Sequence, residues 1–250
     1  MKALILVDLQ NDFCPGGALA VPRGDEVIRV ANALIDRVPL VVATQDLHPR
    51  AHGSFAANHD GRAPFSQIDL HGLPQVLWPI HCVQGTPGAQ LHAKLAASRI
   101  TRIFPKGTDA TVDSYSGFFD NGRRKSTGLD EYLRAQHVTA LYVLGLATDY
   151  CVRATVLDAV QLGYPTTLVV DGCRAVDLQP GDGDRAIAAL ACHFENPHTP
   201  SDLDIQRNEV FANLFSISLR SCMPSMDLDE PFFIYRSKTN DQLPSPAAAD

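Results

Sequence analysis

Short apolar runs alternate along the chain with segments whose apolar residues recur at helical spacing, and this alternation constrains the fold most. The apolar runs are Ala3–Leu9, Leu40–Thr44, Arg102–Pro105, Ala140–Gly145 and Thr166–Val170. The segments with helical spacing are Gly24–Arg37, Gly128–His137, Thr148–Leu162 and Gly183–Cys192. Strands that are apolar throughout are typical of parallel sheets covered on both faces. We therefore predict an α/β fold: a doubly wound, mostly parallel sheet with helices on both faces, a Rossmann-like arrangement of three layers.

Composition excludes several classes of function. The chain has 250 residues and a net charge of −7, which argues against a surface for nucleic acid, because phosphates are bound by clustered Lys and Arg. It contains neither a membrane-length apolar stretch nor a secretion signal. The six cysteines are scattered, without a CxxC pair. We expect a cytoplasmic protein with reduced thiols and with no nucleic-acid or membrane partner. The sequence leaves open whether it is a homo-oligomer.

The chain changes character near its end. Residues 195–250 carry nine acidic and four basic side chains, so this part supplies −5 of the net charge. Within it, the pattern allows a helix at Ile205–Leu219 and a strand at Pro231–Tyr235, and we expect the last ~10 residues to be disordered. We predict one domain over residues 1–194, followed by an atypical acidic C-terminal segment over residues 195–250.

Three residues with chemical potential lie at the ends of predicted strands. Asp8 closes the first strand, where partial burial would raise its pKa toward that of a general base. Lys106 follows the third strand, and Cys151 lies in the first turn of the helix after the fourth, where a helix N-terminus favours the thiolate. In open α/β sheets the carboxyl ends of strands form the binding crevice. Taken singly, each also has a plain explanation: a capping Asp, an exposed Lys and a core Cys. Cys14 is the nearest alternative nucleophile.

A second group of side chains resembles a metal site. Asp46 and His48 form a D-x-H pair beside the end of the second strand, and His52 and His81 follow in the chain. Two or three imidazoles with one carboxylate suit Zn²⁺, Fe²⁺ or Mn²⁺. The alternative is that these are loop histidines with local hydrogen bonds. Cys82 could be a further ligand, but we favour a buried free thiol.

Two aromatic residues, Phe13 and Trp78, lie near the candidate site residues in the sequence. They could line a pocket for a flat ring or belong to the core. The Gly-rich stretches, residues 15–17 and 181–183, match neither a dinucleotide fingerprint nor a phosphate-binding loop. We therefore predict no nucleotide cofactor.

The motifs that carry these residues occur in a characteristic order. They are VDLQNDFCPGGALAVPRGDEVI, TQDLHP, WPIHCVQGTPGAQLH, FPKGTD, SYSGFF, GLATDYCVRATVLDA and VVDGCRAV. In combination they resemble the nicotinamidase/pyrazinamidase family of the isochorismatase-like cysteine hydrolases, over about residues 1–192. The resemblance ends there, and either a lineage-specific extension or a change of reading frame near residue 192 would explain the rest.

The resemblance implies roles for individual residues. It implies an Asp-Lys-Cys catalytic triad at Asp8, Lys106 and Cys151. It implies one divalent metal ion (Zn, Fe or Mn) held by Asp46, His48 and His81, with His52 as a possible fourth ligand. It implies an oxyanion hole at the backbone N–H groups of Ala147 and Cys151, with a cis peptide bond before Ala147. Phe13, Trp78 and Tyr115 match positions that surround the substrate ring.

The activity implied by the resemblance is hydrolysis of nicotinamide to nicotinate and ammonia through a cysteine thioester, with pyrazinamide as a further substrate. One alternative is a related cysteine amidase that acts on a ureido or carbamoyl substrate; such relatives generally lack the D-x-H and WPxH motifs. Another is a non-catalytic metal- or ligand-binding protein, which would give no reason for Asp8, Lys106 and Cys151 to occupy three strand ends.

Overall fold

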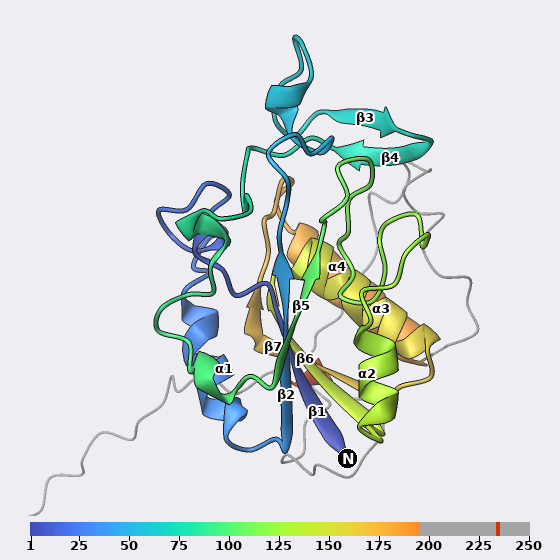
Figure 1. Ribbon diagram of the computed structural model, residues 1–250. Coiled ribbons are helices and arrows are strands. Elements are labelled where there is room, and N and C mark those ends of the chain that lie inside the picture. Colours follow the sequence, from blue (N-terminus) through green and yellow to red (C-terminus); the bar gives the residue numbers. More distant parts are fainter. Residues whose placement is uncertain (196–233, 236–250) are drawn as a thin grey trace, which may run out of the picture.

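The computed structural model describes residues 1–195 and 234–235, and its centre is a six-stranded sheet in the order β5-β2-β1-β6-β7-β8 (Figure 1). All pairings within this sheet are parallel. Its strands are β1 (Lys2–Val7), β2 (Leu40–Asp46), β5 (Arg102–Lys106), β6 (Ala140–Leu146), β7 (Thr166–Arg174) and β8 (Ile234–Tyr235). The predicted parallel α/β fold is confirmed.

Helices cover both faces of the sheet, as predicted. They are α1 (Glu26–Ile35), α2 (Leu129–Ala135), α3 (Arg153–Gln161) and α4 (Asp182–Glu195). Helix α1 lies on one side, against β7, β6 and β1, while α2, α3 and α4 lie on the other (Figure 1). In α1 the buried side chains Val27, Ala31 and Ile35 recur every four residues, which places them on one face of the helix. None of the helices in the described residues is long and apolar enough to span a membrane.

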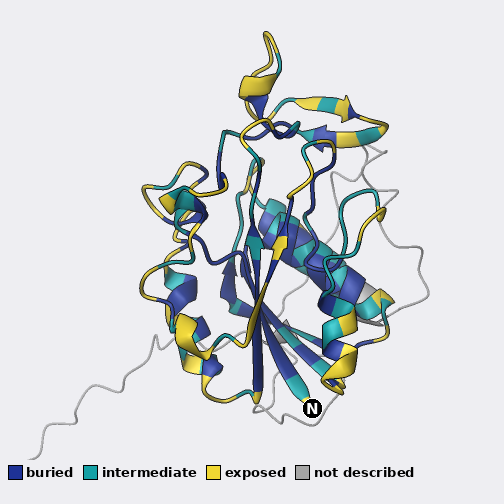
Figure 2. Ribbon diagram, viewed as in Figure 1, coloured by how far each residue is buried: buried dark blue, intermediate teal, exposed yellow. Residues whose placement is uncertain are grey.

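The order of the strands determines where a ligand can bind. The chain passes outward from β1 to β2 and then β5, and afterwards from β6 to β7 on the other side of β1. The direction therefore reverses between β1 and β6, and the carboxyl ends of strands at such a point form a crevice. Strands β1 and β2 are buried along nearly their whole length (Figure 2). Polar side chains at their ends therefore lie against a dry core.

The edge strand β5 explains how a lysine becomes buried. Its residues alternate, with Arg102, Ile103 and Pro105 exposed and Phe104 and Lys106 buried. Successive side chains of a strand point to opposite faces, so Lys106 follows Phe104 inward. Pro105 is tolerated because an edge strand needs no N–H on its outer side. The sequence prediction ended this strand one residue too early; Lys106 is its last residue.

Several other predicted boundaries were also too short. Strand β2 extends to Asp46, β7 extends to Arg174, and β1 ends at Val7, two residues earlier than predicted. The predicted helix from Thr148 begins as a π-helical turn, Thr148–Val152, which continues into α3. The short predicted strand near residue 231 is described only as β8, and the helix predicted at Ile205–Leu219 lies outside the described residues.

The region between β2 and β5, where we found little regular pattern, contains a hairpin and short 3-10 turns. The hairpin strands are β3 (Gln67–Leu70) and β4 (Leu73–Val76), which pair antiparallel. The 3-10 turns of the chain are Asn11–Phe13, Ala56–Asn58, Pro87–Ala89 and Ala97–Arg99. The hairpin projects beyond the carboxyl ends of the main sheet (Figure 1). Its strands have only four residues each and include Pro74, which is why periodicity missed them.

Gly145 allows β1 and β6 to approach closely beside the site. It pairs with Val7, has φ +141°, and a Cβ there would lie 2.1 Å from the Val7 carbonyl oxygen. We expect Gly145→Ala to lower the free energy of unfolding by about 1–3 kcal/mol more than Gly72→Ala does. Gly72 has φ +87° but open space around it, so it isolates the backbone strain, roughly 1 kcal/mol. Urea unfolding measures both, and equal losses would contradict the close contact.

Candidate active site and metal centre

The ammonium group of Lys106 lies at the centre of the site, between the ends of β5, β1 and β2. Its Nζ lies 2.9 Å from Asp8 Oδ2 and 2.5 Å from Asp46 Oδ1. It also donates to the Ser114 carbonyl oxygen at 2.8 Å and lies 3.4 Å from Cys151 Sγ. Lys106 is only 2% exposed. The two carboxylates outweigh the effect of burial and raise its pKa well above the usual value, so the ammonium is charged.

Asp8 lies directly beyond β1 and is fully buried. Its Oδ1 accepts a hydrogen bond from Thr44 Oγ1 at 2.6 Å, and the Thr44 hydroxyl accepts from the Asp8 N–H at 3.2 Å. Burial raises the pKa of Asp8 above its ordinary value, although Lys106 opposes this shift. The direction is the one expected from the sequence. A carboxylate with a raised pKa, fixed in orientation by Thr44, is suited to take up and release a proton.

Cys151 lies in the π-helical turn after β6 and is 7% exposed. Burial raises the pKa of its thiol well above the usual value; Lys106 offsets this only in part, and Asp8 raises the pKa further. The sequence-based expectation that the turn would favour a free thiolate is therefore wrong for the resting protein. Desolvation outweighs the helix N-terminus, because Cys151 is enclosed by the core. The thiol needs a base at hand, and Asp8 is that neighbour.

The segment before Cys151 has the expected cis peptide bond, between Leu146 and Ala147. Ala147 and Cys151 are both buried and belong to the same turn, in which the Ala147 carbonyl accepts from the N–H groups of Tyr150 and Val152. Their own N–H groups lie at the N-terminal end of a helix, where backbone donors lack intrahelical partners.

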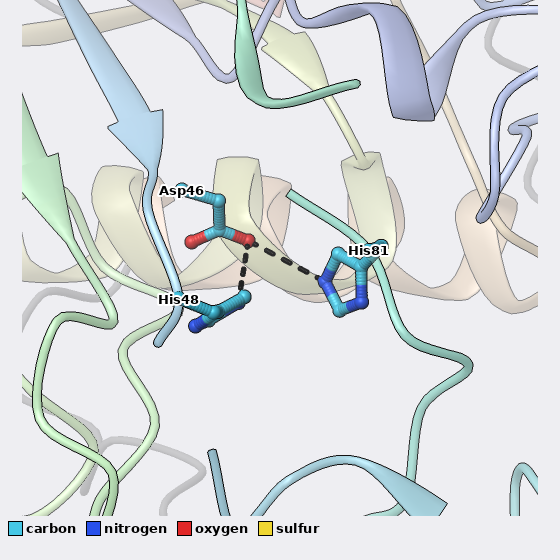
Figure 3. A group of neighbouring side chains, drawn as sticks. All are labelled: Asp46, His48 and His81. Carbon is cyan, nitrogen blue, oxygen red and sulfur yellow. Dashed lines mark ion pairs between the residues drawn. The ribbon is translucent and has the colours of Figure 1, made fainter. Parts of the chain in front are cut away.

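Three of the predicted metal ligands converge on one point (Figure 3). His48 Nε2 and His81 Nε2 lie 3.4 Å and 3.7 Å from Asp46 Oδ2, on the side of the carboxylate away from Lys106. Although burial lowers the pKa of His48, the Asp46 carboxylate raises it to about 9. The pocket therefore stabilises positive charge. Asp46 is shared, with one oxygen for Lys106 and the other for the two imidazoles.

The histidine tautomers fit a cation. Nδ1 of His48 lies 2.8 Å from the Gly107 carbonyl and Nδ1 of His81 lies 2.8 Å from the Pro79 carbonyl, so each Nδ1 carries the hydrogen. Each Nε2 is thereby left with a lone pair, and His48 Nε2 is buried without a hydrogen-bond partner. Gly107 has φ +62°, and a Cβ there would lie 2.3 Å from the His48 ring. These three residues fit a divalent metal by their own chemistry.

His52 is hydrogen-bonded differently. The Ser54 N–H donates to its Nδ1 at 3.1 Å, and the Ser54 hydroxyl lies 2.7 Å from the same nitrogen. A neutral ring that accepts at Nδ1 carries its hydrogen on Nε2. That Nε2 is buried and without a hydrogen-bond partner, and the ring centroid lies 4.3 Å from that of His48. His52 thus presents an N–H donor to the same region.

Aromatic side chains form a wall beside these groups. Phe13 packs against His81 with ring centroids 5.5 Å apart. Trp78 is buried, and its indole N–H donates to the Tyr115 hydroxyl at 3.2 Å. Two aromatic side chains beside a buried nucleophile can confine a flat ring. The three predicted pocket residues thus lie around the candidate site, two of them in direct contact with each other.

Comparisons with known proteins agree with this geometry. The isochorismatase domain model matches residues 2–197. Over 205 residues the chain is 53% identical to the nicotinamidase of Escherichia coli (strain K12), covering 80% of this chain and 96% of the relative. The chain belongs to the nicotinamidase family of isochorismatase-domain proteins.

Solved structures of nicotinamidase-family proteins share the fold. The yeast nicotinamidase bound to the inhibitor nicotinaldehyde is 36% identical, with a TM-score of 0.73 and coverage of 77% of this chain and 97% of that chain. The pyrazinamidase of Pyrococcus horikoshii in complex with zinc is 37% identical, with a TM-score of 0.62 and coverage of 76% and 94%. The match spans the domain that carries the residues described above.

The sequence analysis did not identify every residue at this nicotinamidase-family site. Tyr150, next to Cys151, packs edge-on against Trp78 with centroids 4.8 Å apart and completes the aromatic wall. Asp12 accepts a hydrogen bond from the Cys82 N–H at 2.7 Å and so fixes the peptide that follows His81. Position beside a motif residue was the one available signal for Tyr150. Asp12 offered none, because its partner lies 70 residues away.

Four cysteines are described, and all are free thiols: Cys14, Cys82, Cys151 and Cys173. Burial raises the pKa of Cys14 to about 11, and also raises that of Cys82. Of these four, the structure places Cys151 beside the buried lysine and Asp8. Cys14, the alternative nucleophile in the sequence, lies in a turn that contributes no such pair, and Cys82 is the buried thiol we favoured.

Proposed function

We propose that this protein is a nicotinamidase that hydrolyses nicotinamide to nicotinate and ammonia, and also accepts pyrazinamide. The observation that carries the proposal is the buried Asp8, Lys106 and Cys151 cluster joined through Asp46 to the His48 and His81 imidazoles. The names of its relatives support the same reaction: an E. coli nicotinamidase and a yeast one bound to nicotinaldehyde. It is an amidohydrolase that cleaves a non-peptide amide C–N bond.

In this proposal the substrate ring lies against Phe13, Trp78 and Tyr115, with Tyr150 behind Trp78. Asp46, His48 and His81 hold one divalent metal ion, and His52 supplies an N–H donor beside it instead of a fourth ligand. The bound ion supplies a Lewis acid for the ring nitrogen. A zinc-bound pyrazinamidase relative favours zinc, while the same donor set also suits iron and manganese.

The chemistry is then acyl transfer to sulfur. Asp8 takes the proton of the Cys151 thiol as sulfur attacks the amide carbon, and the oxygen that becomes negative accepts from the N–H groups of Ala147 and Cys151. Asp8 gives the proton to the nitrogen, the C–N bond breaks and ammonia leaves. Water loses a proton to Asp8 and adds to the thioester, the C–S bond breaks, and the proton returns to sulfur as nicotinate forms. Lys106 balances the negative charge throughout.

The test is ammonia release from nicotinamide, pyrazinamide and an N-carbamoyl amino acid by the purified full-length protein. We expect release from the two ring amides and none above background from the carbamoyl compound. Release from the carbamoyl compound alone would transfer the assignment to the related ureido and carbamoyl amidases. Release from none of them, with metal supplied, would leave a binding protein.

Removal of the metal is a separate expectation. Dialysis against EDTA should abolish ammonia release from nicotinamide, because the ion orients the ring, and addition of Zn²⁺, Fe²⁺ or Mn²⁺ should restore it. Far-UV circular dichroism of the dialysed protein serves as the control, since loss of fold would confuse the result. Full activity in EDTA, with no metal detected by elemental analysis, would contradict the proposed centre.

The remaining proposals concern context. We propose that residues 1–194 form the hydrolase domain and that the protein acts in the cytoplasm, where its thiols stay reduced. Its partner is a small amide.

A further inference from the structure

Gln10 is a buried polar residue for which the proposed chemistry has no use. It lies two residues beyond Asp8, after β1 has ended, and its exposed fraction is 0%. A buried amide is retained only when its hydrogen bonds are satisfied. The partners of Gln10 therefore show what it holds in place.

One side-chain amide satisfies both backbone groups of Asp46. Gln10 Oε1 accepts from the Asp46 N–H at 2.8 Å, and Gln10 Nε2 donates to the Asp46 carbonyl at 2.7 Å. The last backbone pairing between β1 and β2 is Leu6 with Ala43. Gln10 thus takes the place of a β1 backbone three residues further along β2. On the other side β5 continues to pair as far as Asp46 with Lys106.

The orientation of the Asp46 peptide matters because its carboxylate serves two groups. Oδ1 lies 2.5 Å from Lys106 Nζ, and Oδ2 lies between the two imidazole Nε2 atoms. A site of this kind tolerates displacements of only about 0.5 Å. Rotation of the Asp46 peptide would move the carboxylate away from both partners.

We propose that Gln10 is a positioning residue that fixes Asp46 for metal binding through the Asp46 backbone, without contacting the metal or the substrate. The inference rests on the proposed metal site. Partners of this kind, one shell removed from the ion, typically contribute a factor of about 10–100 in metal affinity.

The competing explanation is that Gln10 only tethers the 87–89 turn. Its Nε2 also donates to the Ala89 carbonyl at 2.8 Å. Gln45 supplies a matched control, because its Nε2 donates to the same carbonyl at 2.8 Å. A tether would be weakened by either substitution, whereas positioning of the Asp46 peptide depends on Gln10.

The experiment compares the Zn²⁺ dissociation constants of wild type, Gln10→Met and Gln45→Leu, by competition with a chromogenic chelator. Methionine keeps the volume of glutamine but neither hydrogen-bonding group. We expect Gln10→Met to bind Zn²⁺ about 10–100-fold more weakly and Gln45→Leu to stay within about twofold of wild type. Thermal unfolding in EDTA shows that each variant is folded before its affinity is measured.

Gln10→Asn is measured in the same way, because it keeps the amide one methylene short of Asp46 and is the milder change if methionine prevents folding. Unchanged Zn²⁺ affinity in either folded Gln10 variant would overturn the inference, as would equal losses in the Gln10 and Gln45 variants. Absence of Zn²⁺ binding by wild type would instead reject the proposed metal site, which keeps the two failures distinct.

Discussion

Cys151→Ala should reduce ammonia release from nicotinamide by about 10⁴-fold or more, while the protein stays folded. Removal of a nucleophile that acts together with its base eliminates the covalent route, so the loss is far larger than that of a single hydrogen bond. The substituted side chain is small and buried, and alanine fits the same space. A coupled assay of ammonia over a wide range of enzyme concentration measures the loss.

Cys173→Ala is the matched control for this prediction. Cys173 is a buried free thiol in β7 whose Sγ donates to the Val169 carbonyl at 3.3 Å, away from Lys106 and Asp8. We expect its activity to stay within about twofold of wild type, with a loss of stability of about 1 kcal/mol for the hydrogen bond. A Cys151→Ala protein with more than a tenth of wild-type activity would refute the thioester mechanism.

Lys106→Met should both abolish activity and destabilise the fold. Lys106 is the cation between the carboxylates of Asp8 and Asp46, and its removal leaves two buried acids without their partner. Loss of one member of a buried ion pair costs about 3–5 kcal/mol. Urea unfolding at pH 7 in EDTA measures the loss, and exposed Lys94→Met is the control, expected to change stability by less than about 0.5 kcal/mol.

The loss in Lys106→Met should depend on pH in a defined direction. Although burial alone would raise it, Lys106 and His48 hold the pKa of Asp46 well below its usual value. A carboxyl whose folded pKa is lowered contributes stability above its unfolded pKa, about 4, and loses that contribution as the pH falls. The difference between wild type and Lys106→Met should therefore be largest at neutral pH and shrink toward pH 4. A difference independent of pH would mean that packing, not charge, is lost.

The positions of the candidate groups were predictable because parallel strands present their carboxyl ends at one edge of a sheet. Asp8, Lys106 and Cys151 each follow or end an apolar run, so alternation of strands and helices was enough to bring them to one crevice. The resemblance to the nicotinamidase family added the metal ligands and the ring-binding residues, whose separation in sequence carries no geometric information. The hairpin β3–β4 escaped prediction because its short strands lack an apolar period.

Protonation states could not be predicted from position. A helix N-terminus suggested a thiolate at Cys151, yet burial dominates and raises the pKa of the thiol. His52 appeared in the sequence as one more imidazole, but the hydrogen bond from the Ser54 N–H leaves a donor where a ligand would need a lone pair. Both outcomes depend on atoms that meet only after folding.

The sequence by itself determined the α/β fold, the family and the crevice, since these follow from apolar periodicity and from motifs that are local in the chain. Only the tertiary structure decided that Lys106 joins Asp8 to Asp46, and that Gln10 holds the Asp46 peptide. The physical reason is that burial and hydrogen bonding depend on partners 36 to 60 residues apart in the chain. No local pattern encodes the angle and distance at which such partners meet.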